Sequence, residues 1–311
     1  MATVYGHCDP KFNAVRDLLQ GFVNYGEEIG TAIFVNVDDE DVVDLHGGYT
    51  DENRRIPWTK DTIVNVYSTT KMVASLAVLM LVDWKILSIS DKVVQHLPEF
   101  GSNGKEDVEV RHLLNHTSGL AGWEDPVAFD DIMDGQGASK RLADQAPWWT
   151  PGAASGHHSL TFGHLLGALF ESSSTINLGE SNASSESSHI RSKVFSLVPE
   201  PALVNSPANG HGNARALTRL MSTIALAGRE GALPCGTVDQ IFQEQARGVD
   251  LVIDQSLRWG VGFGGSMVIM DLDRKVTISY VMNRLTDLGP GNKVARQYAT
   301  AMYGALGAYL S

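Results

Sequence analysis

The sequence predicts an α+β protein in which one antiparallel sheet is built from both ends of the chain and is flanked by the N- and C-terminal helices. Three observations support this fold class: a strand hairpin near each terminus, helix-spaced apolar residues at both ends, and mostly helical sequence between them. We therefore assign residues 1–60 plus 205–311 to the sheet-containing part, and residues 61–204 to an inserted, mainly helical subdomain.

The elements follow from local patterns. The first helix is amphipathic, because apolar residues recur at helical spacing between Phe12 and Val23. The acidic run 38–41 separates two strand-like segments, 31–37 and 42–46, which is typical of a hairpin. The second hairpin and the last helix are predicted at 266–270 with 276–282, and at 293–309.

One segment departs from this regular pattern. Residues 172–188 contain eight serines and few large apolar side chains, so they contribute little to a core. We predict a mobile Ser-rich loop there.

Composition limits the class of partner. The 36 acidic residues outnumber the 24 basic ones, and the formal net charge is −12, so we expect no nucleic-acid partner and no anionic membrane surface. The apolar stretch 72–82 is much shorter than the ~20 residues of a membrane-spanning helix. The N-terminal residues lack a secretory pattern, and Cys8 and Cys235 form no C-x-x-C motif. A cytoplasmic location is expected, and the oligomeric state stays open.

The segment with the clearest chemical implication is Tyr67-Ser68-Thr69-Thr70-Lys71, which precedes an apolar helix at 72–81. Ser68 and Lys71 lie three residues apart, so a helix places both on one face within one turn. The helix N-terminus favours negative charge developing near Ser68, and burial lowers the pKa of an amine such as Lys71. This predicts a serine nucleophile activated by a lysine, although a Ser at a helix start is also an ordinary N-cap.

Three further segments, in order along the chain, extend this S-x-x-K motif. The chain resembles the serine β-lactamase-like and penicillin-binding-protein-like group, in particular the class C β-lactamase-related branch known as family VIII carboxylesterases. The four segments that carry the resemblance are 65–71, 110–120, 149–167 and 209–217 with 280–284. The resemblance implies a β-lactamase/transpeptidase-like fold, a small-molecule acyl substrate and no cofactor.

The sequence departs from that family at two places. Where the family carries a catalytic Tyr, this chain has His157, which is either a replacement group for proton transfer or a polar residue without a catalytic role. A strand motif that normally lies beside the nucleophile is absent between Phe263 and Gly264. The resemblance then implies that the strand starting at Gly265 or Ser266 supplies half of an oxyanion hole, with the Ser68 N–H as the other half.

Three other features of the sequence have ordinary structural interpretations. Gly260 to Gly265 fits G-x-G-x-x-G, but the sequence that follows predicts a strand and not the helix of a dinucleotide site. His112 and His116 have metal-ligand spacing without an accompanying Glu, and a capped helix end is the better interpretation. Trp149 is expected to line the substrate site or to pack beneath Pro151.

Several functions remain open at this point. A hydrolase of carboxylic esters or related acyl compounds is the leading hypothesis, with Ser68, Lys71 and His157 as catalytic groups and Gly265, Ser266 and Trp149 around the substrate. An acyltransferase of secondary metabolism uses the same acyl-enzyme. A catalytically impaired binding paralogue is suggested by the two departures, and a β-lactamase or D-Ala peptidase ranks last.

Overall fold

The computed structural model describes residues 3–179, 210–229, 233–244, 246–254, 256–259, 267–284 and 293–309. The chain divides into two compact units, each composed of segments that are distant in sequence. Unit 1 contains Met1–Thr69, His211–Cys235 and Gly264–Ser311, and unit 2 contains Thr70–Gly210 and Gly236–Phe263. We had placed 236–263 with the sheet, whereas these residues return to the helical unit.

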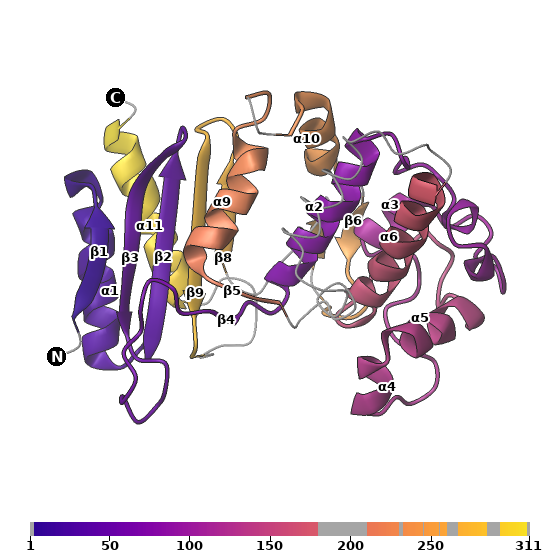
Figure 1. Ribbon diagram of the computed structural model, residues 1–311, viewed down its shortest axis with the longest axis horizontal. Helices are drawn as coiled ribbons and strands as arrows, with labels where there is room; N and C mark the ends of the chain where they lie inside the picture. Colours follow the sequence, from indigo (N-terminus) through magenta and orange to yellow (C-terminus); the bar gives the residue numbers. More distant parts are fainter. Residues whose placement is uncertain are drawn as a thin grey trace. The chain divides into compact units, whose positions relative to one another are not determined.

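Unit 1 is built on a five-stranded antiparallel sheet with the order β1-β3-β2-β9-β8 (Figure 1). Its strands are β1 (Val4–Cys8), β2 (Gly30–Val37), β3 (Glu40–Gly48), β8 (Met267–Asp271) and β9 (Val276–Met282). Both predicted hairpins are present, and β2 pairs with β9, so the two ends of the chain form one sheet as predicted.

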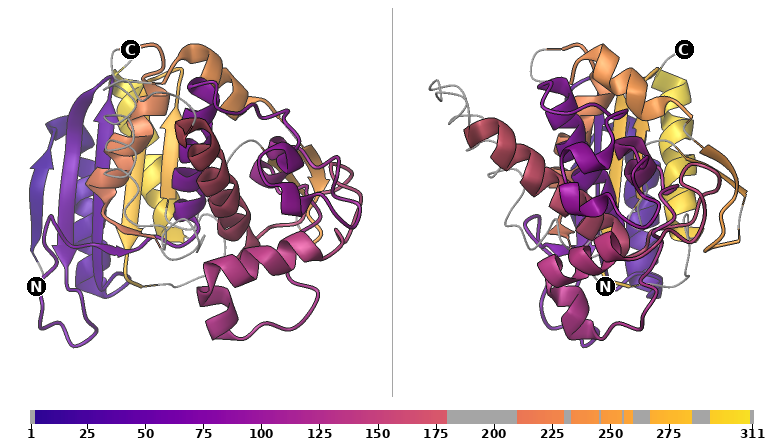
Figure 2. Two further views of the ribbon diagram at one scale, coloured as in Figure 1. Left: turned by 45° about the vertical axis from the view of Figure 1, so that its right-hand side comes forward. Right: turned by 90° about the vertical axis from the view of Figure 1, so that its right-hand side faces the viewer.

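Helices cover both faces of this sheet (Figure 2). A short 3₁₀ turn, Pro10–Phe12, leads into α1 (Asn13–Tyr25), which packs with α11 (Lys293–Tyr309) on one face. The other face carries α9 (Ala214–Ala225), where Thr218 donates a hydrogen bond to the Phe34 carbonyl (3.3 Å). Because β2 and β9 are covered on both sides, every residue in them is buried.

The turn between β2 and β3 is shorter than expected, with two residues in place of the predicted four. Only Asp38 and Asp39 connect the strands, and both have positive φ values, 52° and 77°. A two-residue hairpin with two left-handed residues matches the twist of the flanking strands, and Asp tolerates that conformation better than most residues. The Asn36 side chain supports the turn by accepting the Asp39 N–H (3.2 Å).

The segment at the end of β9 has a structural role. The Tyr280 hydroxyl donates to the Glu28 carboxylate, and Arg284 donates to the Gly26 carbonyl. The Asn283 side chain accepts the Gly30 N–H and donates to the Tyr49 carbonyl, both at 3.0 Å. Residues 280–284 therefore connect β9 to the start of β2, so their resemblance to the esterase branch reflects the fold of unit 1.

Unit 2 is mainly helical around a second hydrophobic core, to which α2, α3, α5 and α6 contribute. Its helices are α2 (Thr69–Asp83), α3 (Val110–Leu114), α4 (Phe129–Met133), α5 (Gly135–Asp144), α6 (Thr161–Gly179) and α10 (Cys235–Phe242), with 3₁₀ turns at Val93–Gln95 and Pro98–Phe100. Helices α2 and α10 each begin at the boundary with unit 1. The hairpin of β6 (Ala246–Val249) and β7 (Ser256–Trp259) also belongs to unit 2.

The first part of the Ser-rich segment is helical. Residues 172–179 form the last turns of α6 and not the loop that we expected at 172–188. Ser lowers helix stability by less than about 0.7 kcal/mol per residue, so an apolar helix can extend through it. The Ser172 hydroxyl also donates to the His96 carbonyl. Residues 180–188 lie outside the described residues.

Across the residues that the structure describes, no helix is both long enough and apolar enough to span a membrane.

The buried carboxyl of Glu28 makes stability depend on pH. Only 2% of its surface is exposed, and burial raises its pKa to about 7, against ~4.3 in an unfolded chain. The folded state therefore keeps a proton that the unfolded state releases, and stability falls as pH rises from about 4.5 to 7.

We predict that Glu28→Gln raises the free energy of unfolding by roughly 1–3 kcal/mol at pH 8, because the amide carries no charge to bury, and that this gain disappears at pH 4. Urea unfolding at both pH values measures the effect. Glu40→Gln, at an exposed position of β3, is the matched control. A variant that is no more stable than the wild type at pH 8 would contradict this account of Glu28.

Candidate functional site

The chain reaches Ser68 through a short two-stranded ladder in unit 1. Strand β4 (Val64–Asn65) pairs antiparallel with β5 (His211–Gly212). Directly after β5, the Asn213 side chain caps α9 by accepting the Ala216 N–H (2.9 Å). Residues 211–217 of the late segment thus support the strand that precedes the nucleophile motif.

A strained turn lies between β4 and α2. Tyr67 has a left-handed backbone with φ of 47°, and its N–H donates to the Asn65 side chain (2.7 Å). The Thr69 N–H then donates to the Val66 carbonyl (3.1 Å). A left-handed conformation at a residue other than Gly costs on the order of 1–3 kcal/mol, and such strain is common at functional sites. The turn places Ser68 immediately before the first residue of α2.

Lys71 lies in the first turn of α2, three residues after the half-buried Ser68. Residues at this spacing on a helix have Cβ atoms about 5–6 Å apart. The Lys71 side chain is fully buried, and its Nζ donates to the Ser159 carbonyl (3.0 Å). Burial lowers its pKa to about 8, so on the order of a tenth of the amines are neutral at pH 7 and can accept a proton.

Two of the segments that carry the family resemblance are hydrogen-bonded to each other. The turn that follows α3 contains His116, which is buried and left-handed with φ of 63°. Its carbonyl accepts the Gly156 N–H (3.0 Å), and its Nδ1 accepts the His158 N–H (3.1 Å). The Gly152 N–H donates to the Thr117 carbonyl (2.9 Å). The turn at 116–117 therefore fixes the backbone on both sides of the loop that carries His157.

Trp149 contacts the same loop. Gly119 has a φ of 81°, and a Cβ there would lie 2.7 Å from both the Pro147 Cβ and the Trp149 carbonyl oxygen, so this position requires glycine. The Trp149 ring covers Gly156, where any side chain would overlap it. Trp149 is thus adjacent to the residue that precedes His157, and the packing seen here is on Gly156.

His157 is half-buried, and its backbone N–H donates to the Asp250 carboxylate (2.9 Å). Its ring centre lies 5.1 Å from that of His116. Burial and the Lys71 charge together lower the pKa of His157 to about 4, against the opposing effect of the Asp250 charge. At neutral pH the imidazole is therefore uncharged, which leaves it able to accept a proton.

His158 has a different environment. It is fully buried, with its Nδ1 2.6 Å from the Gly156 carbonyl and its Nε2 2.7 Å from the Ser118 hydroxyl. A carbonyl only accepts, so Nδ1 carries the hydrogen and Nε2 accepts from Ser118. Burial lowers its pKa to about 4. Because both ring nitrogens are engaged, His158 holds the loop in place.

Sequence reasoning did not find Asp250, which follows β6 and is fully buried. It lies 93 residues after His157, in the segment that we had assigned to the other part of the molecule. A lone acidic residue after a short strand carries no signal of such a contact.

The predicted oxyanion residues Gly265 and Ser266 lie outside the described residues. The glycine-rich run 260–265 comes between β7 and β8, so a strand follows it and the helix required by a dinucleotide site does not.

The two histidines with metal-ligand spacing make other contacts. The His112 Nδ1 accepts the Glu109 N–H (3.1 Å), and the His116 Nδ1 is engaged by His158. Within the described ranges, no group of three or more His, Cys, Asp or Glu side chains is arranged to hold a metal ion.

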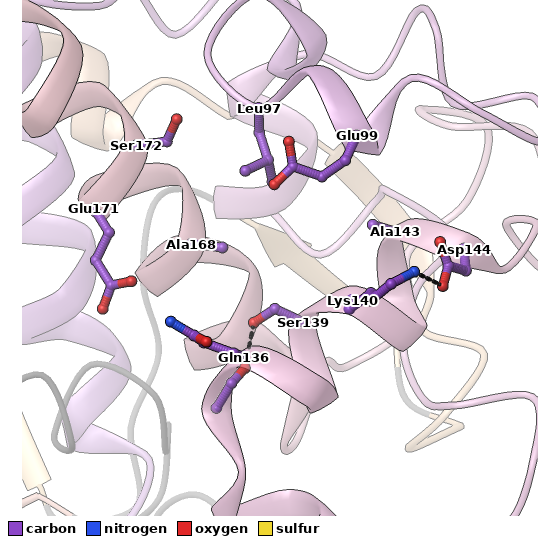
Figure 3. A pocket seen from close by; sticks show the side chains of 11 residues that line it. Leu97, Glu99, Gln136, Ser139, Lys140, Ala143, Asp144, Ala168, Glu171 and Ser172 are labelled. Atoms are coloured by element: carbon purple, nitrogen blue, oxygen red, sulfur yellow. Dashed lines mark hydrogen bonds and ion pairs between the residues drawn. The ribbon is translucent and has the colours of Figure 1, made fainter.

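A pocket of about 500 Å³ in unit 2 lies elsewhere, between α5, α6 and the 3₁₀ turn at 98–100 (Figure 3). Its lining includes Glu99, Glu171 and the ion pair of Lys140 with Asp144 (2.5 Å). None of Lys71, His157 and Trp149 lines it, so it is not the candidate catalytic site.

Comparison with known proteins identifies the family of this chain. Residues 15–181 match the beta-lactamase family. The esterase/beta-lactamase LipL of Mycobacterium tuberculosis is 31% identical over 166 residues, which are 53% of this chain and 38% of LipL. The match therefore spans well under half of that relative's length.

Two solved structures resemble nearly the whole chain. A family VIII carboxylesterase is 25% identical with a TM-score of 0.84, and a penicillin-binding protein homologue from Caulobacter crescentus is 28% identical with the same TM-score. Each comparison covers 97% of this chain and all of the other. With more than half of its residues matched and its β-lactamase/transpeptidase-like fold, this chain belongs to the beta-lactamase family.

Proposed function

We propose that this protein is a serine hydrolase that cleaves a carboxylic ester or a related acyl compound through an acyl-enzyme on Ser68. The observation that carries the proposal is the full burial of Lys71 one helical turn after Ser68, with its pKa lowered to about 8. An exposed lysine would remain protonated at neutral pH and would not serve as a base.

Acylation begins when the neutral Lys71 amine takes the Ser68 hydroxyl proton. The Ser68 Oγ attacks the acyl carbonyl carbon, the bond from that carbon to the leaving alkoxide breaks, and the proton passes to the leaving group. Water then attacks the acyl-enzyme, gives one proton back to the serine oxygen, and releases the carboxylic acid. No cofactor enters this sequence.

His157 is proposed as the group that relays the proton to and from the leaving group. Its neutral imidazole at neutral pH can accept a proton from Lys71, and the low pKa of about 4 means that it gives that proton up readily. It takes the place of the family Tyr, and the loop at 155–158 holds it through hydrogen bonds to His116 and Asp250.

The remaining groups are assigned roles by the resemblance. The Ser68 N–H, at the N-terminus of α2, would be one oxyanion donor, and the backbone of Gly265 or Ser266 the other. Trp149 would border the acyl group beside His157, as its contact with Gly156 supports.

An ester substrate is favoured over a β-lactam by the names of the relatives, since LipL carries both descriptions and the structural neighbour is a carboxylesterase. Transfer of the acyl group to an alcohol or amine uses the same intermediate and differs only in the acceptor.

We predict that the protein hydrolyses short-chain nitrophenyl esters faster than nitrocefin, and that Ser68→Ala abolishes both this turnover and labelling by a fluorophosphonate, because both need an activated serine. Turnover rates and the intact mass of the labelled protein are the measurements. Ser75→Ala is the matched control: Ser75 lies on the same helix, is buried, and its hydroxyl has no hydrogen-bond partner among the described residues.

Labelling that persists in Ser68→Ala would contradict the nucleophile assignment. Faster turnover of nitrocefin would replace the ester proposal with a β-lactamase. If added alcohol or amine gives more transfer product than acid, the protein is an acyltransferase.

We predict that His157→Ala lowers kcat by about 10²–10⁴-fold, since one proton-transfer group is lost. His157→Tyr should also lower kcat, because the loop is packed around an imidazole and a phenol has a pKa of ~10. Steady-state kinetics test both variants, with thermal unfolding to confirm that each remains folded. Higher activity in the Tyr variant would show that His157 impairs an otherwise family-like site, and unchanged rates in both would remove it from the mechanism.

A further inference from the structure

Asp250 is a buried carboxylate in unit 2 that the proposed chemistry does not yet use. Its exposed fraction is 0%. The Oδ1 atom accepts three backbone N–H groups, from His157 (2.9 Å), Val252 (3.0 Å) and Ile253 (3.2 Å). One oxygen therefore closes the turn that follows β6 and also holds the backbone of His157.

A second contact joins the same two segments. The Leu251 N–H donates to the Ser155 carbonyl (2.8 Å), two residues before His157. The turn at 250–253 and the loop at 155–157 are thus connected on both sides of Asp250, and a shift of the turn would move His157 with it.

The hydrogen bonds from the backbone do not by themselves explain why residue 250 is an aspartate and not an asparagine. An asparagine has the same shape and offers the same acceptor oxygen to the three N–H groups, without the free-energy penalty of a buried charge. The Asp250 Oδ2 has no hydrogen-bond partner among the described residues, so the second oxygen adds no anchoring. The carboxylate of Asp250 therefore needs an explanation other than backbone anchoring, and the residues around His157 provide one.

The titratable groups around the His157 ring are Lys71 on α2, His116 after α3, His158 on the same loop, and Asp250. Of these, Asp250 alone is acidic. Burial and the Lys71 charge both oppose a positive charge on His157, whereas Asp250 favours it. Each time His157 takes up a proton, the carboxylate is the neighbouring group that stabilises the imidazolium.

We propose that Asp250 is a positioning residue for His157, fixing its backbone through Oδ1 and stabilising its protonated form with the carboxylate charge. This inference rests on the proposed function, in which His157 relays a proton. The arrangement has the same logic as the carboxylate that orients a catalytic histidine in a Ser-His-Asp triad, although here the hydrogen bond is to the backbone of the histidine and not to its ring.

The test compares Asp250→Asn with Asp254→Asn. The first keeps the acceptor oxygen and removes the charge. The second removes a charge from an exposed residue of the same turn and is the matched control. Asp250→Ala, which removes the acceptor as well, is expected to unfold more readily, and urea unfolding separates that effect from the loss of charge.

We predict that Asp250→Asn unfolds like the wild type but lowers the pKa of the His157 ring, because the favourable charge is gone. In steady-state kinetics the maximal kcat should fall about tenfold with little change in KM, because the protonated form of His157 is less well stabilised. Asp254→Asn should match the wild type in every measurement.

The His157 ring is titrated by NMR in the absence of substrate, so that the outcome does not depend on catalysis. An unchanged His157 pKa in Asp250→Asn would overturn the proposal even if the enzyme is active. A lowered pKa in a protein that hydrolyses no ester would instead support the role of Asp250 and refute the proposed function.

Discussion

The burial of one amine, that of Lys71, is the constraint on which the candidate site depends. A protonated amine loses its hydration when it is enclosed, and the Ser159 carbonyl returns only part of that loss. The side chain is kept in place by its helix, because Ala77, Val78 and Leu81 of α2 belong to the buried core of unit 2. Helix α2 cannot move Lys71 into solvent without exposing this core.

The Ser159 carbonyl, which accepts the hydrogen bond from Lys71, also has to be held in position. Ser159 follows a loop with no regular secondary structure, and loops of this kind move unless their backbone groups are bonded. Here the turn at 116–117, the buried His158 and the Asp250 carboxylate each bind the loop through backbone hydrogen bonds. The histidines stay neutral at neutral pH because they are buried, so the loop adds no positive charge near Lys71. The packing of this loop therefore determines both where its histidines lie and that they are uncharged.

The sequence predicted the elements whose periodicity is regular. Helix α11 begins and ends at the predicted residues, Lys293 and Tyr309, and both hairpins are found within one or two residues of their predicted bounds. Strand β1 was missed because it lies at the edge of the sheet, where only Val4 is buried and no apolar alternation is required. The helical end of α6 was missed because serine content indicates weak core packing and does not by itself exclude a helix.

Only the part of the site that is formed by residues close in sequence, or located by the resemblance, could be predicted. Ser68 and Lys71 are close because they are close in sequence, and His157 lies in a motif that a resemblance locates. Asp250 contacts His157 only because of the tertiary structure. The two residues lie in different segments of unit 2, which are separated in sequence by a segment of unit 1. The described contacts of Tyr280 and Asn283 are structural, since they connect the end of β9 to residues around the start of β2. Contacts between distant segments leave no periodic signal in a single sequence.

The measurement that tests this account most directly is an NMR titration of the Lys71 side-chain amine, using lysine labelled with ¹³C and ¹⁵N and assigned by the loss of its signal in Lys71→Met. The account predicts a pKa of about 8, because burial favours the neutral amine. A pKa near ~10.4, the value of a lysine in water, would contradict it, since Lys71 would then be protonated at neutral pH and could not activate Ser68.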